Sequence, residues 1–224
     1  MSVLKFRMSI LRNFTSLHQF SPPISDDVVH KQREFAGKIL TYPAFNDCLL
    51  RNMHRHRFIS VVDFDEVIVP TKLRTYHDLV EEISKTRHVN LDRYSLMFMS
   101  SNYFLEYAPD SNVTELLPLL RHREYVNTPG LRVKSFQNPR QCQRINSHHC
   151  ETSFNAVIPY SLGRVHHYRE TCYSSNNPQL WSDHKCAVLA NRTMIDSETS
   201  RFHDALIDRV KVVPRDLRKP TKGV

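Results

Sequence analysis

The sequence is poor in glycine and has no long apolar run, and each absence excludes a class of protein. Only 4 of its 224 residues are glycine. Because P-loop and dinucleotide-binding folds cradle phosphates on glycine-rich turns, this scarcity excludes both. No apolar stretch approaches the roughly 20 residues that a membrane span requires. Residues 1–12 alternate basic and apolar types, so they lack the continuous hydrophobic centre of a secretory signal.

The composition is that of a folded globular protein with a basic surface. Hydrophobic residues make up 40% of the chain and charged residues 24%, which is far from the signature of disorder. We expect a single domain over residues 1–224, with a core at 28–172 and a C-terminal extension at 173–224. The formal net charge of +8 favours an anionic partner. That partner could be a nucleic acid, an acidic membrane surface or a phosphorylated small molecule, and the charge does not choose among them.

An odd number of cysteines allows up to two disulfides and one free thiol, or none. The five are Cys48, Cys142, Cys150, Cys172 and Cys186. Cys142, His148, His149 and Cys150 lack the paired short cysteine spacing of a zinc site, so a loop disulfide or plain surface residues fit them better. N-glycosylation sequons begin at Asn13, Asn112 and Asn191 and are compatible with a lumenal protein.

Periodicity and turn residues predict a mixed α/β protein. Pro43 disfavours helix just before it, so two helices are expected on either side of it. Thr75 and Asp78 have the spacing of a capping box at the start of a third. The segments expected to be helical are 28–41, 44–54 and 75–83, with a weaker piece at 200–210; those expected to be strands are 95–107, 131–136 and 164–169.

A short apolar run that ends in three carboxylates is the most informative stretch. Residues 58–62 are too few for a typical helix and predict a buried central strand whose carboxyl end carries the acids. Asp63 and Asp65, two positions apart in extended chain, point the same way, while Phe64 turns away. Burying them beside Glu66 without a counter-ion would be costly. A Mg²⁺ or Mn²⁺ ion therefore explains the acids better than a solvated strand end does.

Two adjacent histidines form a second candidate site. His166 and His167 lie in an expected strand and point to opposite faces, so only one can face a given site. A neutral imidazole is a good Mn²⁺ ligand beside carboxylates, and Arg169 or Tyr168 could hold a phosphate oxygen. The alternative is an edge strand with incidental histidines. Lys134 is a lone lysine, for which simple exposure is the default expectation.

An apolar strand that ends in Asp-x-Asp occurs in two enzyme classes. In haloacid-dehalogenase-type phosphatases the first aspartate is the nucleophile and an acid follows two residues later. Asp63 and Asp65 fit that opening, but after residue 70 no pair of acids follows an apolar run, as those enzymes require. In nucleotide-sugar glycosyltransferases of the GT-A architecture, Asp-x-Asp binds Mn²⁺, which neutralises the leaving diphosphate. A downstream histidine often completes that metal shell.

Four short sequence segments, in a fixed order, narrow the glycosyltransferase interpretation to one family. They are Asn46–Asn52, Val62–Pro70, Lys134 before Asn138-Pro139, and Val165–Arg169. Together, over about residues 42–170, they resemble glycosyltransferase family 92. That family, formerly a domain of unknown function, includes a β-1,4-galactosyltransferase that acts on fucose of N-glycan cores.

The resemblance implies a GT-A-like α/β fold with a mixed sheet and flanking helices. It implies transfer of a sugar, galactose in the named relative, from a UDP-sugar to a glycan or glycoprotein acceptor with inversion, using Mn²⁺ or Mg²⁺. Asp65 would bind the metal directly, Asp63 would be shared between metal and ribose, and one of His166 and His167 would be the late metal ligand. Arg169 remains the candidate for the donor's phosphate.

The resemblance also implies a location in the cell, and it shows that one part of the family's fold is not recognisable in this sequence. It predicts a Golgi enzyme anchored in the membrane by a segment outside this chain, with no nucleic-acid partner. The family's first strand and helix, which carry much of the nucleobase pocket, are not recognisable, so we expect a fold incomplete on its N-terminal side. An inactive glycan-binding or interaction module is the alternative function. Inversion requires a carboxylate base, and the candidates, none preferred, are Glu66, Glu106, Glu124 and Glu151.

Overall fold

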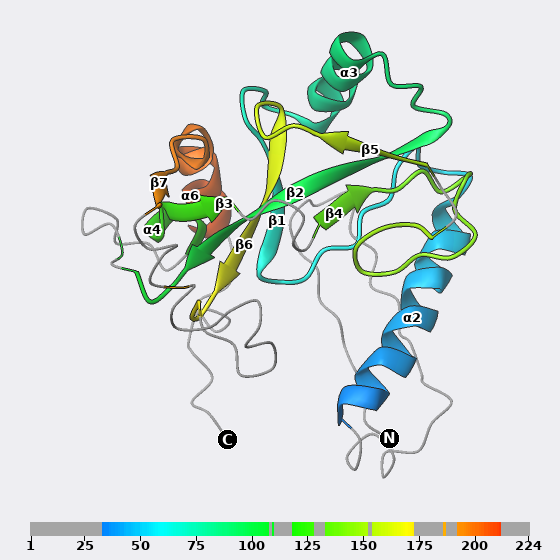
Figure 1. Cartoon of the computed structure of the whole chain (residues 1–224), viewed down its shortest axis with the longest axis horizontal. Helices are drawn as coiled ribbons and strands as arrows, with labels where there is room; N and C mark the ends of the chain where they lie inside the picture. Colours follow the sequence, from blue (N-terminus) through cyan, green and yellow to red (C-terminus); the bar gives the residue numbers. More distant parts are fainter. Residues whose placement is uncertain are drawn as a thin grey trace.

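A mixed sheet of seven strands forms the centre of the computed structural model (Figure 1). The structure describes residues 33–107, 109, 118–127, 133–151, 154–172, 186 and 192–211. The strand order is β1-β6-β2-β3-β7, and β4 and β5 also pair with β2. The strands are β1 (Glu66–Pro70), β2 (Tyr94–Phe104), β3 (Glu124–Asn127), β4 (Val133–Phe136), β5 (Phe154–Ile158), β6 (Gly163–Arg169) and β7 (Met194–Ile195). The predicted mixed α/β class is confirmed, and so are the strands expected near 95–107, 131–136 and 164–169.

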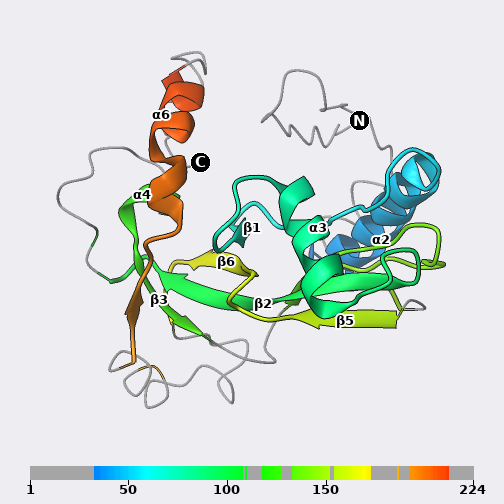
Figure 2. The same ribbon diagram turned by 90° about the horizontal axis from the view of Figure 1, so that it is seen from above.

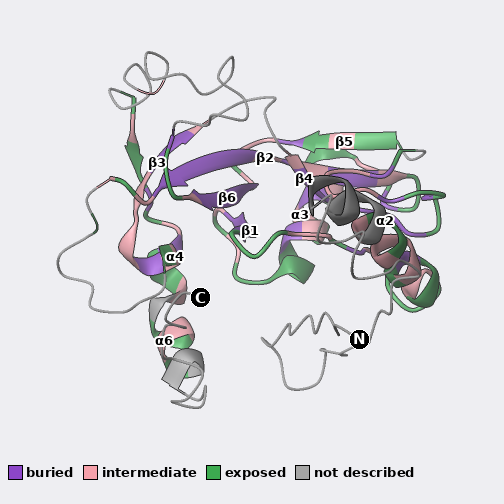
Figure 3. Ribbon diagram, turned by 90° about the horizontal axis from the view of Figure 1, so that it is seen from below, coloured by how far each residue is buried: buried purple, intermediate pink, exposed green. Residues whose placement is uncertain are grey.

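The long strand β2 joins the two halves of the sheet. Its first half, Tyr94–Phe98, pairs with β5 in parallel, and its second half, Ser100–Phe104, pairs with β6 in parallel. β4 and β3 pair with β2 in antiparallel fashion, and β1 pairs with β6 in the same sense. Figure 3 shows β2 and β6 buried along most of their length, whereas β5 is largely exposed. The interior of the sheet is therefore β2 and β6.

Helices lie at both ends of the sheet, as Figure 2 shows from above. They are α2 (Arg33–Asn52), α3 (Tyr76–Arg87), α4 (Pro118–Arg121) and α6 (His203–Lys211), with a 3-10 turn, η1 (Thr199–Phe202), before α6. The capping box predicted for α3 is confirmed, because the Asp78 N–H donates to the Thr75 hydroxyl at 3.1 Å. Leu79 and Ile83 then pack α3 into the main hydrophobic core beside β2.

The prediction of two helices separated at Pro43 is wrong. One helix, α2, runs through the proline. Tertiary contacts just beyond it hold the helix: Leu49 is buried against the 142–150 loop, and the Asn46 amide both donates to and accepts from the backbone of Ile145, at 3.3 and 3.2 Å. These contacts offset the hydrogen bond that proline removes. The part of the first predicted helix before residue 33 lies outside the described residues.

The apolar run at residues 58–62 is not a strand of the sheet, which corrects the prediction. Ile59 alone makes an isolated bridge, to Gln137, and the strand begins instead at Glu66. Asp63 and Asp65 thus precede strand β1 and Glu66 is its first residue, so the acids lie at the start of a strand rather than at the end of one. The apolar side chains of this run are buried even though its backbone does not pair as a strand. Phe58 packs against the core that contains Phe136, and Ile59 packs into the cluster that contains Leu49.

Two disulfides pin loops around the sheet. Cys142 is bonded to Cys150, and Cys172 to Cys186, while Cys48 is free. Of the alternatives that the sequence left open, the structure has two bridges and one free thiol, and the first bridge rules out zinc ligation by those two cysteines. The asparagines of the three sequons, Asn13, Asn112 and Asn191, lie outside the described residues. Among the helices that the structure describes, none is both long and apolar enough to cross a membrane.

Candidate active site

Two polar clusters lie on opposite faces of strand β6. The adjacent histidines separate them, as strand alternation predicts. His167 Nε2 lies 3.2 Å from Asp65 Oδ2, on the face where β1 contributes Glu66. His166 Nε2 lies 3.2 Å from the hydroxyl of Tyr103, on the other face. The predicted opposite orientations are confirmed, and the structure shows that His167 is the histidine that faces Asp65, which sequence alone left open.

A compact turn presents the acids beside His167. The Glu66 N–H donates to the Asp63 carbonyl at 3.1 Å, and the Asp63 N–H donates back to Glu66 Oε2 at 3.2 Å. The Tyr168 N–H donates to the Asp65 carbonyl at 2.8 Å, which ties the turn to β6. The side chains of Asp63 and Asp65 remain 56% and 51% exposed. The turn thus fixes the backbone while leaving two carboxylates open to solvent.

Lys134 completes this cluster from strand β4. Its side chain is buried, and its ammonium lies 2.8 Å from Asp63 Oδ2 and 2.7 Å from Glu66 Oε2. The expectation of simple exposure is wrong: the register pairs Lys134 with the buried Phe98 of β2. Partial burial acts to raise the pKa of Asp63, but hydrogen bonds from Lys134 and the charges of Lys134 and His148 outweigh it, so the pKa is lowered.

The donor set on this face fits a divalent cation. Asp65 and His167 offer a carboxylate oxygen and an imidazole nitrogen side by side, a combination that suits Mn²⁺. Lys134 balances one of the three nearby carboxylates, so two negative charges remain when all three are ionised. A single divalent ion would neutralise them. Of the predicted metal ligands, the structure brings Asp65 and His167 into contact, joins Asp63 to the same cluster through Lys134, and places His166 on the other face of β6.

Arg169 lies on the same face as His167. It is two residues along β6, half-buried, and opposite Phe104 of β2 in the register. A guanidinium there is on the correct side of the strand to meet a phosphate held near His167. Its assignment to the donor phosphate remains a prediction.

The four candidate bases are in different situations. Glu66 is buried and bound to Lys134. Glu106 accepts the Cys172 N–H at 2.7 Å. Glu151 is paired with Arg144, and Glu124 is half-buried at the start of β3. The engaged state of Glu66 argues against its use as a proton acceptor.

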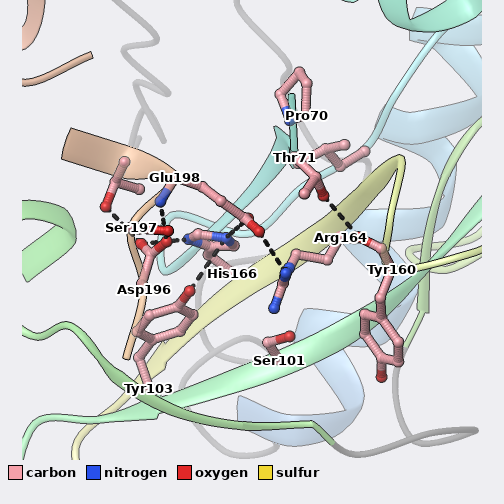
Figure 4. A network of polar contacts seen from close by, with 12 residues as sticks. Pro70, Thr71, Ser101, Tyr103, Tyr160, Arg164, His166, Asp196, Ser197 and Glu198 are labelled. Carbon is pink, nitrogen blue, oxygen red and sulfur yellow. Dashed lines mark hydrogen bonds and ion pairs between the residues drawn. The ribbon is translucent and has the colours of Figure 1, made fainter. Parts of the chain in front are cut away.

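The second cluster is buried and joins the C-terminal segment to the sheet (Figure 4). His166, Asp196 and Glu198 offer ligand atoms that all lie within 4.8 Å of one another, so they could hold a metal ion. Protein groups also contact the acids: Arg164 donates to Glu198, and Thr199 donates to Asp196. Burial lowers the pKa of His166, against the opposing effect of Glu198 and Asp196.

Cationic side chains surround this second cluster. The Arg164 guanidinium lies 4.8 Å from the ring centroid of Tyr125, a cation–π contact. Arg123 donates to the Asp196 carbonyl at 2.9 Å, and Arg201 donates to the Pro70 carbonyl at 2.7 Å. The described residues 192–202 are thus tied to strands β1, β3 and β6. Sequence reasoning missed this network because its members are far apart in the chain.

The mixed α/β sheet and the contact between Asp65 and His167 on a neighbouring strand agree with the glycosyltransferase class that the sequence resembles. The family model for glycosyltransferase family 92 matches residues 14–208. The chain belongs to glycosyltransferase family 92, which confirms the resemblance seen in the sequence. Membership implies a glycosyltransferase with a sugar donor and an acceptor. A search of curated proteins found no match. The two disulfides indicate a protein of the secretory pathway.

Proposed function

We propose that this chain carries the metal and diphosphate site of a glycosyltransferase that uses a UDP-sugar, with Mn²⁺ held by Asp65 and His167. The observation that supports the proposal best is the contact of 3.2 Å between the Asp65 carboxylate and the His167 imidazole. Asp65 lies in the turn before β1 and is half exposed, whereas His167 lies in β6. The sugar is galactose, the acceptor a glycan of a glycoprotein, and the transfer inverting, as the family resemblance implies. The site of action is the Golgi lumen, which is consistent with the disulfides.

Exposure favours the Asp65 and His167 pair over the buried cluster as the catalytic metal site. A catalytic ion must keep coordination positions open for its substrate. The difference lies in the carboxylates: Asp65 is 51% exposed beside the buried His167, whereas the acids of the other cluster, Asp196 and Glu198, are 1% and 12% exposed. An ion in the buried cluster could be structural only. His167 is therefore our choice for the late metal ligand.

The side chains on this face have separate roles in the proposed reaction. A bound Mn²⁺ would neutralise the charge that develops on the leaving diphosphate. Asp65 and His167 would hold the ion. Asp63 has one oxygen bonded to Lys134 and would use the other for the ion or the ribose. Arg169 would contact a phosphate oxygen from the same face of β6.

A binding and turnover experiment tests the proposal. The wild-type protein should bind UDP by calorimetry only when Mn²⁺ is present, and should hydrolyse or transfer from UDP-galactose. Asp65→Asn and His167→Ala should each lower Mn²⁺-dependent UDP binding and turnover by about tenfold or more. Asp92→Asn is the matched control, because Asp92 is an exposed acid paired with Arg57.

Two outcomes would contradict the proposal. Turnover that survives Asp65→Asn unchanged would remove the metal site from the reaction. Absence of both Mn²⁺ and UDP binding in a folded wild-type protein would favour the inactive glycan-binding module instead.

A further inference from the structure

Lys134 is a buried lysine whose ammonium lies between two carboxylates of unequal exposure. The side chains of Lys134 and Glu66 are 1% and 2% exposed, whereas that of Asp63 is 56% exposed. The ammonium therefore joins a buried acid to an accessible one. Removing an ammonium from water is costly, and the two carboxylates in contact with Lys134 offset that cost.

The buried half of this arrangement organises the backbone. Glu66 Oε2 accepts from the Lys134 ammonium at 2.7 Å and from the Asp63 N–H at 3.2 Å. Lys134 thus holds the carboxylate that closes the turn at its start. The Asp65 carbonyl, bonded to the Tyr168 N–H at 2.8 Å, holds the other end. The turn is fixed at both ends by this chain's own groups.

The exposed half of the arrangement orients Asp63. Its Oδ2 accepts from the Lys134 ammonium at 2.8 Å, which restricts the rotation of the carboxylate. One oxygen is then committed to the lysine, and because the side chain is half exposed an external partner can still reach the carboxylate. Asp65 has no such link to Lys134 among the described contacts and faces His167 instead.

We propose that Lys134 is a positioning residue, an internal counter-ion that preassembles the turn of residues 63–66 and orients Asp63 toward the cation and nucleotide. This inference rests on the proposed function and adds a role for a residue that touches no substrate. Metal sites of this kind depend on the groups that orient their ligands. Lys134 performs that task by charge and hydrogen bonding together.

The sign of one measurement separates positioning from simple electrostatics. A positive charge beside a cation site repels the cation, so by charge alone Lys134→Met should strengthen Mn²⁺ binding. If Lys134 positions the acids, the same substitution weakens binding, because the turn loses its clamp and Asp63 its orientation. The two roles predict opposite changes in the Mn²⁺ dissociation constant.

The experiment measures Mn²⁺ affinity by electron paramagnetic resonance of the free ion, together with thermal unfolding of the metal-free protein. Lys134→Met should lower the affinity by about tenfold or more and should lower the unfolding temperature, because Glu66 is left buried without its partner. Lys85→Met is the control, since Lys85 is an exposed lysine paired with Glu81. It should change neither quantity.

A double variant separates positioning from damage to the fold. Lys134→Met with Glu66→Gln removes both buried charges and keeps an oxygen that can accept the Asp63 N–H. We expect its unfolding temperature to return toward the wild-type value, while Mn²⁺ affinity stays low because Asp63 is no longer held. Wild-type or tighter Mn²⁺ binding by this variant would overturn the inference. Failure of the wild type to bind Mn²⁺ would overturn the proposed function instead.

Discussion

The ion pair between Arg164 and Glu198 offers a quantitative test of how the C-terminal segment is held on the sheet. The two side chains are 8% and 12% exposed, so the pair is almost entirely removed from water. Glu198→Ala would leave the guanidinium buried with its partner gone. Breaking a buried pair in this way costs about 3 kcal/mol or slightly more. For a chain of this size that corresponds to a fall of roughly 6–12 °C in unfolding temperature.

Thermal unfolding with and without EDTA also determines whether this cluster holds a metal. The measurement is made on an Asp65→Asn background, so that an ion at the proposed active site does not contribute. If the protein groups alone hold the cluster, EDTA changes nothing and Glu198→Ala gives the full loss. If His166, Asp196 and Glu198 bind an ion, EDTA destabilises the parent, and Glu198→Ala abolishes that effect.

A matched substitution makes the reasoning refutable. Replacing both Arg164 and Glu198 with methionine removes the buried charges together and should recover much of the lost stability, as apolar replacement of buried pairs does. An unfolding temperature for Glu198→Ala within about 1 °C of the parent would show that the pair contributes little, because 1 kcal/mol moves the midpoint by roughly 2–4 °C.

Two further predictions concern the cysteines. Cys48 is exposed at the surface, but partial desolvation raises the pKa of its thiol, and the nearby Asp47 raises it further, against a hydrogen bond from Asn52. Alkylation by iodoacetamide at pH 8, followed by mass spectrometry, should therefore be slower in the folded protein than in urea and faster in Asp47→Asn than in the wild type. Equal rates in all three samples would contradict the shift. The Cys142–Cys150 bridge closes a loop with a sequence separation of 8. Replacing both cysteines with serine should lower the free energy of unfolding, measured in denaturant, by about 2.5 kcal/mol. An unchanged denaturation midpoint would show that the bridge does not stabilise the fold.

The sequence predicted local features well because their causes are local. The Thr75 cap, the strand at 164–169 and the opposite orientations of His166 and His167 each depend on residues within a few positions of one another. Backbone periodicity is enough to fix such features.

Sequence reasoning failed where a distant contact overrides a local preference. Pro43 should end a helix, but contacts between Asn46 and Ile145, 99 residues apart, stabilise the helix beyond it. Residues 58–62 have the composition of a strand, but their apolar side chains find burial in two clusters without pairing along their length. Lys134 has no local feature that reveals burial, because its partner Asp63 is 71 residues away.

The adjacency of His166 and His167 explains how one strand serves two purposes. β6 lies between β1 and β2, so both of its edges are paired, and the burial of successive residues along it shows that both of its faces are covered. On one face the cover is incomplete: exposed carboxylates and a buried lysine surround His167, an arrangement suited to a cation that must also reach a substrate. On the other face Arg164, Asp196 and Glu198 enclose His166 and tie the C-terminal segment to the sheet. Because neighbouring residues of a strand share one backbone, an element that anchors His166 also limits the movement of His167. The buried network thus contributes to the precision of the proposed metal site without touching it.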